Sequence, residues 1–437
     1  MSKGDIVYLV WTDLVGIART RGVPRAEFER RKEHGLGWAA AGQALTPFED
    51  IAPNPWGPMT EVRQTPDPAT ERRIEFDAGW PALHLVLCDS LNPDGSPWEC
   101  CTRSFMKAAL ADLKAETGLE LQTAYENEFL LSGGDAPWVS PFSLASARQV
   151  APFLERLTAA LIDADVGLET VEPEYGLHQY EVSTGPATGI AGADRVVITR
   201  ELLREVARQC GLHASITPKP APEAVGNGCH LHMSLWDADG RAAAYDPDGP
   251  GELSEVAAHF VAGVHRHLPA LTALTAPSPV SYLRLGPHHW SCGFAAVGVQ
   301  NREAAIRICP SPKQDPAERG AAYNIELRST DATASPYLAI GAVVRAGLEG
   351  IREQLPLPAL LDRDPADLGD DERGALGIEP LPASLDVALD AFDADRTVRG
   401  WFTPTMVEAY TSLKRFEDAM FTDASPVDLC ERYRLAY

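Results

Sequence analysis

The sequence lacks several motifs and runs whose absence limits its possible functions. It has no GxxxxGK[ST] loop and no GxGxxG fingerprint, so any nucleotide must be held by metal ions and arginines rather than by a glycine-rich loop. No apolar run reaches about 18 residues, so we expect no membrane span. The eight cysteines include no C-x-x-C pair, and no signal peptide is recognised. A reduced, cytoplasmic setting is therefore expected.

Basic residues are also scarce relative to acidic ones. The chain has 38 Lys and Arg against 62 Asp and Glu, a formal net charge of -24. This balance argues against nucleic acid or an anionic membrane as the main partner. Solubility is the simplest explanation of the charge. The 437 residues suffice for two or three domains, or for one large domain with a smaller one attached.

The first 100 residues alternate between strand and loop patterns. Residues 6–22 predict two strands around a turn, followed by a short charged helix that ends near Lys32. Residues 35–77 are rich in Gly, Pro and Ala and show little periodicity, so we expect loops and edge strands there. Residues 83–88 predict a buried strand. This stretch is expected to form a small, strand-rich domain.

From Arg103 onward, helical and strand patterns alternate, which predicts a mixed α+β unit of over 300 residues. The helices are expected at 104–118, 150–165, 193–210, 252–268, 336–352 and 404–421. The strands are expected at 119–132, 168–183, 212–219, 229–236, 293–300 and 304–309. Residues 353–400 are rich in Pro and Asp and are expected to wrap the surface.

The run from Val225 to Asp237 organises the candidate chemistry. A Gly-rich turn leads into an alternating segment in which His230 and His232 lie two residues apart, so both point to one face of a strand. Three other segments repeat this spacing, with the pairs Glu126 and Glu128, Glu181 and Ser183, and Glu326 and Arg328. Polar side chains that face one way from four apolar strands predict a shared wet cavity, because one alone is costly to bury unpaired.

Five glutamates and one histidine on or near these strands are candidate metal ligands: Glu126, Glu128, Glu174, Glu181, Glu326 and His230. Oxygen ligands in this number favour hard cations such as Mg²⁺ or Mn²⁺ over zinc. Two such ions would hold and neutralise the phosphates of a nucleotide during phosphoryl transfer. Four arginines, whose guanidinium forks match carboxylate and phosphate, are further candidates: Arg284, Arg302, Arg307 and Arg328. From spacing alone, carboxylates on a solvated strand face and surface ion pairs remain the simpler alternative.

Taken together, these motifs resemble the glutamine synthetase family over essentially the whole chain. They follow the family order: Y-E-N-E-F at 125–129, E-Y-G-x-x-Q-x-E at 174–181, G-N-G-C-H-L-H-M-S-L at 226–235, Y-L-R-L at 282–285, N-R-E-A-A-I-R-I at 301–308 and N-I-E-L-R-S-x-D-x-x-x-x-P-Y-L at 324–338. The resemblance implies an N-terminal β-grasp domain over 1–100 and a catalytic domain over 101–437 built on a curved antiparallel sheet. It also implies a homo-oligomeric ring, often a dodecamer of two hexamers, with active sites between subunits.

The resemblance further implies roles for individual residues. One metal ion would be held by Glu128, Glu174 and Glu181, and a second by Glu126, His230 and Glu326, with two or three Mg²⁺ or Mn²⁺ ions per site. ATP would contact Glu169, His232, Ser234 and Arg307. Glutamate or the transferring phosphoryl group would contact Gly226, Arg284, Arg302 and Arg328. In the family reaction, ATP phosphorylates the γ-carboxylate of glutamate, and an amine then displaces phosphate to leave an amide.

Two departures from the family pattern bear on the amine. Ammonia-using members carry an Asp in a loop of the β-grasp domain and a Glu in a flap, and both help to bind or deprotonate ammonium. Here Ala39 and Trp290 stand at those positions. Losing both carboxylates removes charge pairing that a small cation needs, whereas an aromatic wall suits an amine with an organic stem. The same Trp occurs in the γ-glutamyl-polyamine and γ-glutamyl-monoamide branches, which this sequence resembles, so Trp290 is counted among the substrate-binding and catalytic residues.

Three further positions keep alternatives open. Val225 replaces an Asn near the glutamate amino group, so another carboxylic acid is an alternative substrate, and Asn324 replaces an Arg that contacts the nucleotide. His288 and His289 are candidates for the missing proton acceptor, with packing of the flap or a surface turn as the simpler role. Ordinary glutamine synthesis from ammonia and a non-catalytic scaffold are the remaining alternatives.

Overall fold

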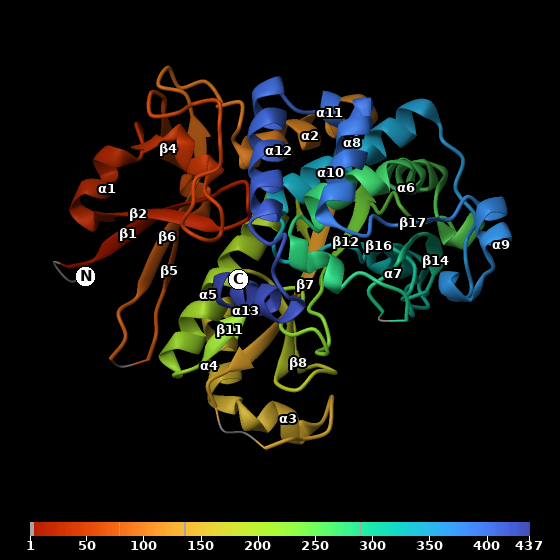
Figure 1. The fold of residues 1–437 in the computed structure, drawn as a ribbon, viewed down its shortest axis with the longest axis horizontal. Coiled ribbons are helices and arrows are strands. Elements are labelled where there is room, and N and C mark those ends of the chain that lie inside the picture. The colour runs from red at the N-terminus through yellow and green to blue at the C-terminus, as the bar shows by residue number, and fades with distance from the viewer. Residues whose placement is uncertain (1–3, 78, 135–136, 289) are drawn as a thin grey trace.

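A computed structural model describes residues 4–77, 79–134, 137–288 and 290–437. Its strands form a six-stranded N-terminal sheet and a nine-stranded central sheet, with a separate two-stranded pair, β13 (Phe294–Ala295) and β17 (Glu379–Pro380). The N-terminal sheet lies at one end of the molecule, and most helices surround the central sheet (Figure 1). The α+β architecture expected from the sequence is confirmed.

The N-terminal sheet has the strand order β2-β1-β6-β4-β3, with β5 paired to β6. β1 and β6 run parallel, and the other pairs are antiparallel. Helix α1 (Arg25–Arg31) places Phe28 on one face, where it packs with apolar residues of β1 and β6. The strands are β1 Ile6–Thr12, β2 Ala18–Pro24, β3 Leu36–Ala39, β4 Glu61–Pro66, β5 Arg72–Ile74 and β6 Leu83–Leu91.

The central sheet is a curved sheet with the order β14-β15-β16-β12-β7-β9-β8 (Figure 1). It is antiparallel except for β14 and β15. Its longest strand, β7, alternates buried and half-buried residues throughout, so the glutamates of the Y-E-N-E-F motif share one face while Tyr125 and Phe129 enter the core on the other. The strands are β7 Glu120–Ser132, β8 Leu168–Pro173, β9 Gln179–Thr184, β10 Ala187–Thr188, β11 His213–Ser215, β12 Cys229–Trp236, β14 Val297–Val299, β15 Ile306–Cys309 and β16 Asn324–Leu327.

Two long helices, α6 (Glu255–Thr275) and α8 (Pro336–Glu353), pack closely against each other. A side chain at Gly263 would lie 2.1 Å from the carbonyl oxygen of Ala346, so only glycine permits this approach. The helices beyond α1 are α2 Thr102–Thr117, α3 Leu144–Gln149, α4 Ala151–Asp163, α5 Ala191–Gln209, α6 Glu255–Thr275, α7 Pro316–Ala322, α8 Pro336–Glu353, α9 Asp370–Leu376, α10 Leu385–Ala394, α11 Arg396–Gly400, α12 Pro404–Ala419 and α13 Pro426–Ala436. None of the helices in the described part of the chain combines the length and apolarity needed to cross a membrane.

Several predicted elements differ from those observed. The prediction that 353–400 only wraps the surface is wrong, because α10 buries Leu385, Leu389 and Phe392 in the core and contacts α6. The strand predicted over 168–183 is two strands, β8 and β9, because the chain turns between them at 174–178. The strand predicted over 212–219 is limited to β11, and the one predicted over 293–300 is divided between β13 and β14. The short helices α3 and α7 and the C-terminal helix α13 were not predicted.

One buried guanidinium joins the N-terminal sheet to the helical layer. Arg103, at the start of α2, donates from Nε and Nη2 to both carboxylate oxygens of Asp194 in α5, over 3.0 and 2.8 Å. It also donates to Asp89 of β6 over 3.0 Å and to Asp67, beside β4, over 2.9 Å. Arg103 and Asp194 are both buried, so this pair meets away from water, whereas Asp67 and Asp89 are partly exposed. Together these ion pairs hold the N-terminal sheet to the helical layer.

Replacing Arg103 with alanine should lower the free energy of unfolding by about 3–5 kcal/mol, because Asp194 would remain buried without its partner. Urea denaturation followed by circular dichroism measures this change. Arg352→Ala is the matched control, because its ion pairs with Glu116 and Glu349 are largely exposed, and it should cost less than about 1 kcal/mol. Equal losses in the two variants would contradict the central role of Arg103.

Candidate active site

The pairing of three neighbouring strands sets the geometry of the site. In β12, His230 lies opposite Glu126 of β7, and His232 lies opposite Glu326 of β16. Residues directly opposite each other share a face, and so do residues two apart along a strand. The four side chains therefore gather on one face. The next strands extend it, because Glu128 lies opposite Glu181 and Arg307 lies opposite Glu326.

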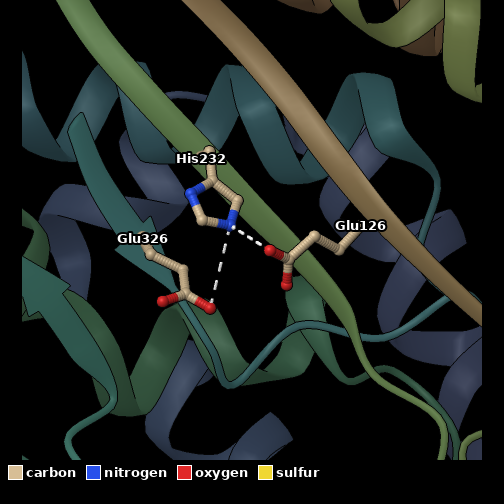
Figure 2. A group of neighbouring side chains, drawn as sticks. All are labelled: Glu126, His232 and Glu326. Carbon is tan, nitrogen blue, oxygen red and sulfur yellow. Dashed lines mark ion pairs between the residues drawn. The ribbon is translucent and has the colours of Figure 1, made fainter. Parts of the chain in front are cut away.

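Both histidines lie among the carboxylates. His230 Nδ1 is 2.9 Å from Glu126 Oε2, 3.6 Å from Glu326 Oε1 and 3.8 Å from Glu128 Oε1. His232 Nε2 is 3.1 Å from Glu126 Oε1 and 3.8 Å from Glu326 Oε1 (Figure 2). Its other ring nitrogen is 2.8 Å from Asn324 Oδ1, which fixes the ring orientation. The resemblance placed only His230 in this set, but the structure brings His232 equally close.

Potential ligand atoms of Glu126, His232 and Glu326 all lie within 4.8 Å of one another. Both acids of this group, Glu126 and Glu326, are held in the charged form. Burial opposes ionisation of Glu326, but the nearby charges of Arg328 and the two histidines outweigh it and lower the pKa to about 2. Burial likewise opposes ionisation of Glu126, and hydrogen bonds to His230 and His232 lower its pKa well below the usual range. Both carboxylates are therefore available as anionic ligands at neutral pH.

A second group of acids, Glu174 and Glu181, has raised rather than lowered pKa values. Burial, followed by the charge of Glu128, raises the pKa of Glu174 to about 7. Burial, followed by the charge of Glu126, raises the pKa of Glu181 to about 9, although Ser183 donates a hydrogen bond to it over 2.7 Å. These acids repel one another and lack enough positive charge nearby. Carboxylate oxygens that repel one another are suitable ligands for a hard divalent cation, because its charge would relieve the repulsion.

Two arginines lie against Glu326, which is fully buried. Arg307 donates to Glu326 Oε2 over 2.8 Å, and Arg328 pairs with Oε1. Arg328 also donates from Nε to the carbonyl oxygen of Arg302 over 3.0 Å and from Nη2 to that of Trp290 over 2.9 Å. The Arg302 side chain itself is exposed. A guanidinium that is 2% exposed and fixed by three partners is well placed to meet an anionic group.

Arg284 and Gly226 meet on the other side of Arg328. Arg284 is 3% exposed and donates to the carbonyl oxygen of Arg328 over 2.9 Å. A Cβ at Gly226 would lie 2.8 Å from Arg284 Cγ, so glycine is required by this approach. The neighbouring Val225 lines a cavity of about 260 Å³ together with Tyr175 and other residues of the turn before β9 and the segment before β12.

The remaining predicted residues lie farther out. Ser234 is buried and accepts a hydrogen bond from Trp236 Nε1 over 2.7 Å, and Glu169 is exposed in the edge strand β8. Ala39 is exposed at the end of β3, in the N-terminal sheet rather than the central one. His288 Nδ1 lies 3.0 Å from Asp364 Oδ2. His289 lies outside the described residues.

Sequence reasoning missed two residues close to the predicted ones. Gln179 donates to Glu128 Oε2 over 3.0 Å and to the carbonyl oxygen of Gly226 over 2.8 Å, which links the acids to the glycine turn. Glu303 accepts a hydrogen bond from the backbone N–H of Trp290 over 2.8 Å. Gln179 is the Q of the E-Y-G-x-x-Q-x-E motif, and Glu303 is the E that follows N-R in the motif at 301–308. Their place within these motifs was the sequence signal that could have identified them.

Comparisons with known proteins agree with this geometry. Residues 2–98 match the family model for the glutamine synthetase N-terminal domain, and residues 99–433 match that for the glutamine synthetase catalytic domain. Gamma-glutamylpolyamine synthetase GlnA3 of Streptomyces coelicolor is 33% identical, over 99% of this chain and 93% of its own length. The glutamine synthetase of Methanocaldococcus jannaschii is also 33% identical, over 86% of this chain and 82% of its own.

Solved structures show the same similarity in three dimensions. The crystal structure of a novel glutamine synthase homolog superposes with a TM-score of 0.92 at 41% identity, covering 100% of this chain and 99% of that chain. A complex of GmaS with ADP superposes with a TM-score of 0.82 at 26% identity, covering 97% of this chain and 95% of that chain. The chain therefore belongs to the glutamine synthetase family and is an ATP-dependent ligase that forms C–N bonds.

Proposed function

We propose that this enzyme joins the γ-carboxyl group of glutamate to a primary organic amine, with release of ADP and phosphate. The proposal of an organic amine rests on Trp290, whose side chain is 60% exposed at the position where ammonia-using relatives have an acid. Ala39 supplies no carboxylate at the second such position. The similarity to gamma-glutamylpolyamine synthetase supports the proposal, whereas equal identity to a glutamine synthetase leaves ammonia as the second candidate.

Divalent metal ions and ATP are general requirements of the family, and the acids of this chain fit them. We propose that Mg²⁺ or Mn²⁺ is held by Glu128, Glu174 and Glu181 at one position and by Glu126, His230 and Glu326 at another, with His232 close enough to join the second. Bound ions would neutralise phosphate charge during transfer from ATP. Glu169, Ser234 and Arg307 are proposed to contact ATP together with His232.

The arginines are proposed to act on the acid substrate. Arg284, held beside Gly226, would bind the carboxylate of glutamate, while Arg328 and Arg302 would stabilise the charge that develops on the phosphoryl group. Phosphorylation is needed because a carboxylate is a poor acyl donor and its oxygen a poor leaving group. Val225 motivates a second candidate substrate, another carboxylic acid, because it offers no hydrogen bond at the glutamate end. We also propose a homo-oligomeric ring with active sites shared between subunits.

A screen of phosphate release tests the proposed function. With ATP, Mg²⁺ and glutamate, primary alkyl, aryl and polyamines should support faster turnover than ammonium, because the exposed indole of Trp290 would contact an organic stem that ammonium lacks, and Ala39 offers no carboxylate to a small cation. Glutamate analogues in the same assay test the identity of the acid. The fastest turnover with ammonium would contradict the proposed amine class, and no phosphate release with any amine would favour a non-catalytic scaffold.

Replacing Trp290 with glutamate should raise turnover with ammonium relative to bulky amines, because it restores a carboxylate for a small cation and removes an apolar wall. The ratio of kcat/KM for ammonium and for the best organic amine measures the effect. Trp138→Glu is the control, because Trp138 is also strongly exposed, at 73%, and lies in the segment before α3. An unchanged ratio in Trp290→Glu would show that Trp290 does not determine the choice of amine.

Metal affinity should depend on pH in a defined direction. Because the pKa values of Glu174 and Glu181 are raised to about 7 and about 9, protons compete with the metal below these values. Mn²⁺ binding should therefore tighten from pH 6 to pH 9 and release protons. Calorimetry in buffers of different ionisation enthalpy measures both effects, and Glu181→Gln should release fewer protons. Affinity that does not change with pH would contradict the assignment of these acids.

A further inference from the structure

A buried acid lies directly beneath the residue that replaces the flap carboxylate. Glu303 is in the turn before β15 and is 9% exposed. Its Oε1 accepts a hydrogen bond from the Trp290 backbone N–H over 2.8 Å. Its Oε2 is buried and has no hydrogen-bond partner within the described residues. Burying a carboxylate oxygen unpaired is costly, so this atom is suited to receive a donor that arrives with a ligand.

The position of Glu303 connects it to the candidate active site. Trp290 binds Glu303 through its N–H and accepts from Arg328 through its carbonyl oxygen, over 2.9 Å. The guanidinium of Arg328 in turn pairs with Glu326. Burial raises the pKa of the Cys292 thiol to about 12, and the charges that act on it come from Arg284, Arg328, Glu303 and Glu326. Glu303 therefore shares one electrostatic neighbourhood with the residues proposed to hold glutamate and phosphate.

A purely structural role does not account for a charged group at this position. One hydrogen bond from a backbone N–H can be accepted by the amide oxygen of glutamine, which would cost less to bury than a carboxylate. Asp364 and His288, two titratable side chains whose charges act on Glu303, already bind each other over 3.0 Å. Asp364 also accepts from the Ala366 N–H over 2.8 Å, so of these two described acids Glu303 is the one with an open oxygen.

We propose that Glu303 binds the ammonium group of the incoming amine and accepts its proton, in place of the carboxylate absent from position 290. This inference rests on the proposed function. One proton passes from the ammonium nitrogen to Glu303 Oε2, and the freed lone pair forms the C–N bond to the acyl carbon of γ-glutamyl phosphate. The acyl C–O bond breaks, and its electron pair leaves with phosphate. The second nitrogen proton goes to the departing phosphate, and Glu303 returns its own proton to solvent.

Two physical features support Glu303 in this role. Burial raises the pKa of its carboxyl group, with the charge of Asp364 adding to this and the Trp290 N–H, His288 and Arg328 opposing it. A more basic carboxylate is a better proton acceptor near neutral pH. The exposed indole above it would also present an apolar surface to the organic stem of the amine while the charged end points inward.

The test compares two nucleophiles in Glu303→Gln, which keeps the oxygen that accepts from Trp290 and removes the charge. Phosphate release is measured with ATP, glutamate and either propylamine, which is protonated at neutral pH, or hydroxylamine, which is not. Propylamine turnover should fall by about 100-fold or more, the contribution typical of general base catalysis. Hydroxylamine turnover should stay close to that of the unmodified enzyme, and raising the pH should partly restore propylamine turnover. Glu318→Gln, the same change at an exposed position of α7, is the matched control and should leave both rates nearly unchanged.

The alternative outcomes separate the two proposals. Unchanged propylamine turnover in Glu303→Gln would overturn the inference. An equal loss with both nucleophiles would also overturn it, because Glu303 would then only support the flap. If the unmodified enzyme forms no hydroxamate from glutamate, hydroxylamine and ATP, the proposed function itself fails before any variant is compared.

Discussion

The site depends on the hydrogen-bonded register of β7, β12 and β16. This register places His230 opposite Glu126 and His232 opposite Glu326. A slip of one residue would turn these polar side chains into the core and bring Leu231 to the solvated face. The buried alternate residues prevent such a slip, since Leu231 is fully buried in the core. Hydrophobic packing behind the sheet thus fixes the positions of the ionisable groups in front of it.

The same face divides into two electrostatic halves. Toward β16, arginines and histidines neutralise Glu326 and Glu126, and the pKa values of both acids are lowered. Toward β9, Glu174 and Glu181 face other carboxylates, and their pKa values are raised. The first half is preorganised by the protein's own charges, whereas the second has little positive charge nearby. This asymmetry supports the proposed metal site at Glu174 and Glu181, and it is the reason why metal binding there should release protons.

The backbone of Trp290 connects Arg328, which we propose acts on the phosphoryl group, to Glu303, which we propose acts on the amine. Its carbonyl oxygen holds Arg328, and its N–H holds Glu303, so both side chains are positioned by one residue of the flap. The side chain of Trp290 remains exposed and is free to contact a substrate. In the proposed role, Glu303 of the turn before β15 would supply the acid that position 290 lacks.

The sequence by itself determined the strands that carry the acids, because alternation with a period of two and the motif order are local properties. It also identified most of the side chains that gather on the central sheet, but not Gln179 as a partner of Glu128 or His232 as a neighbour of Glu126. Only the tertiary structure decided that α10 enters the core and that Glu303 lies beneath Trp290. The physical reason is that the path of a turn and the docking of a short helix depend on packing against distant segments, which no local pattern records.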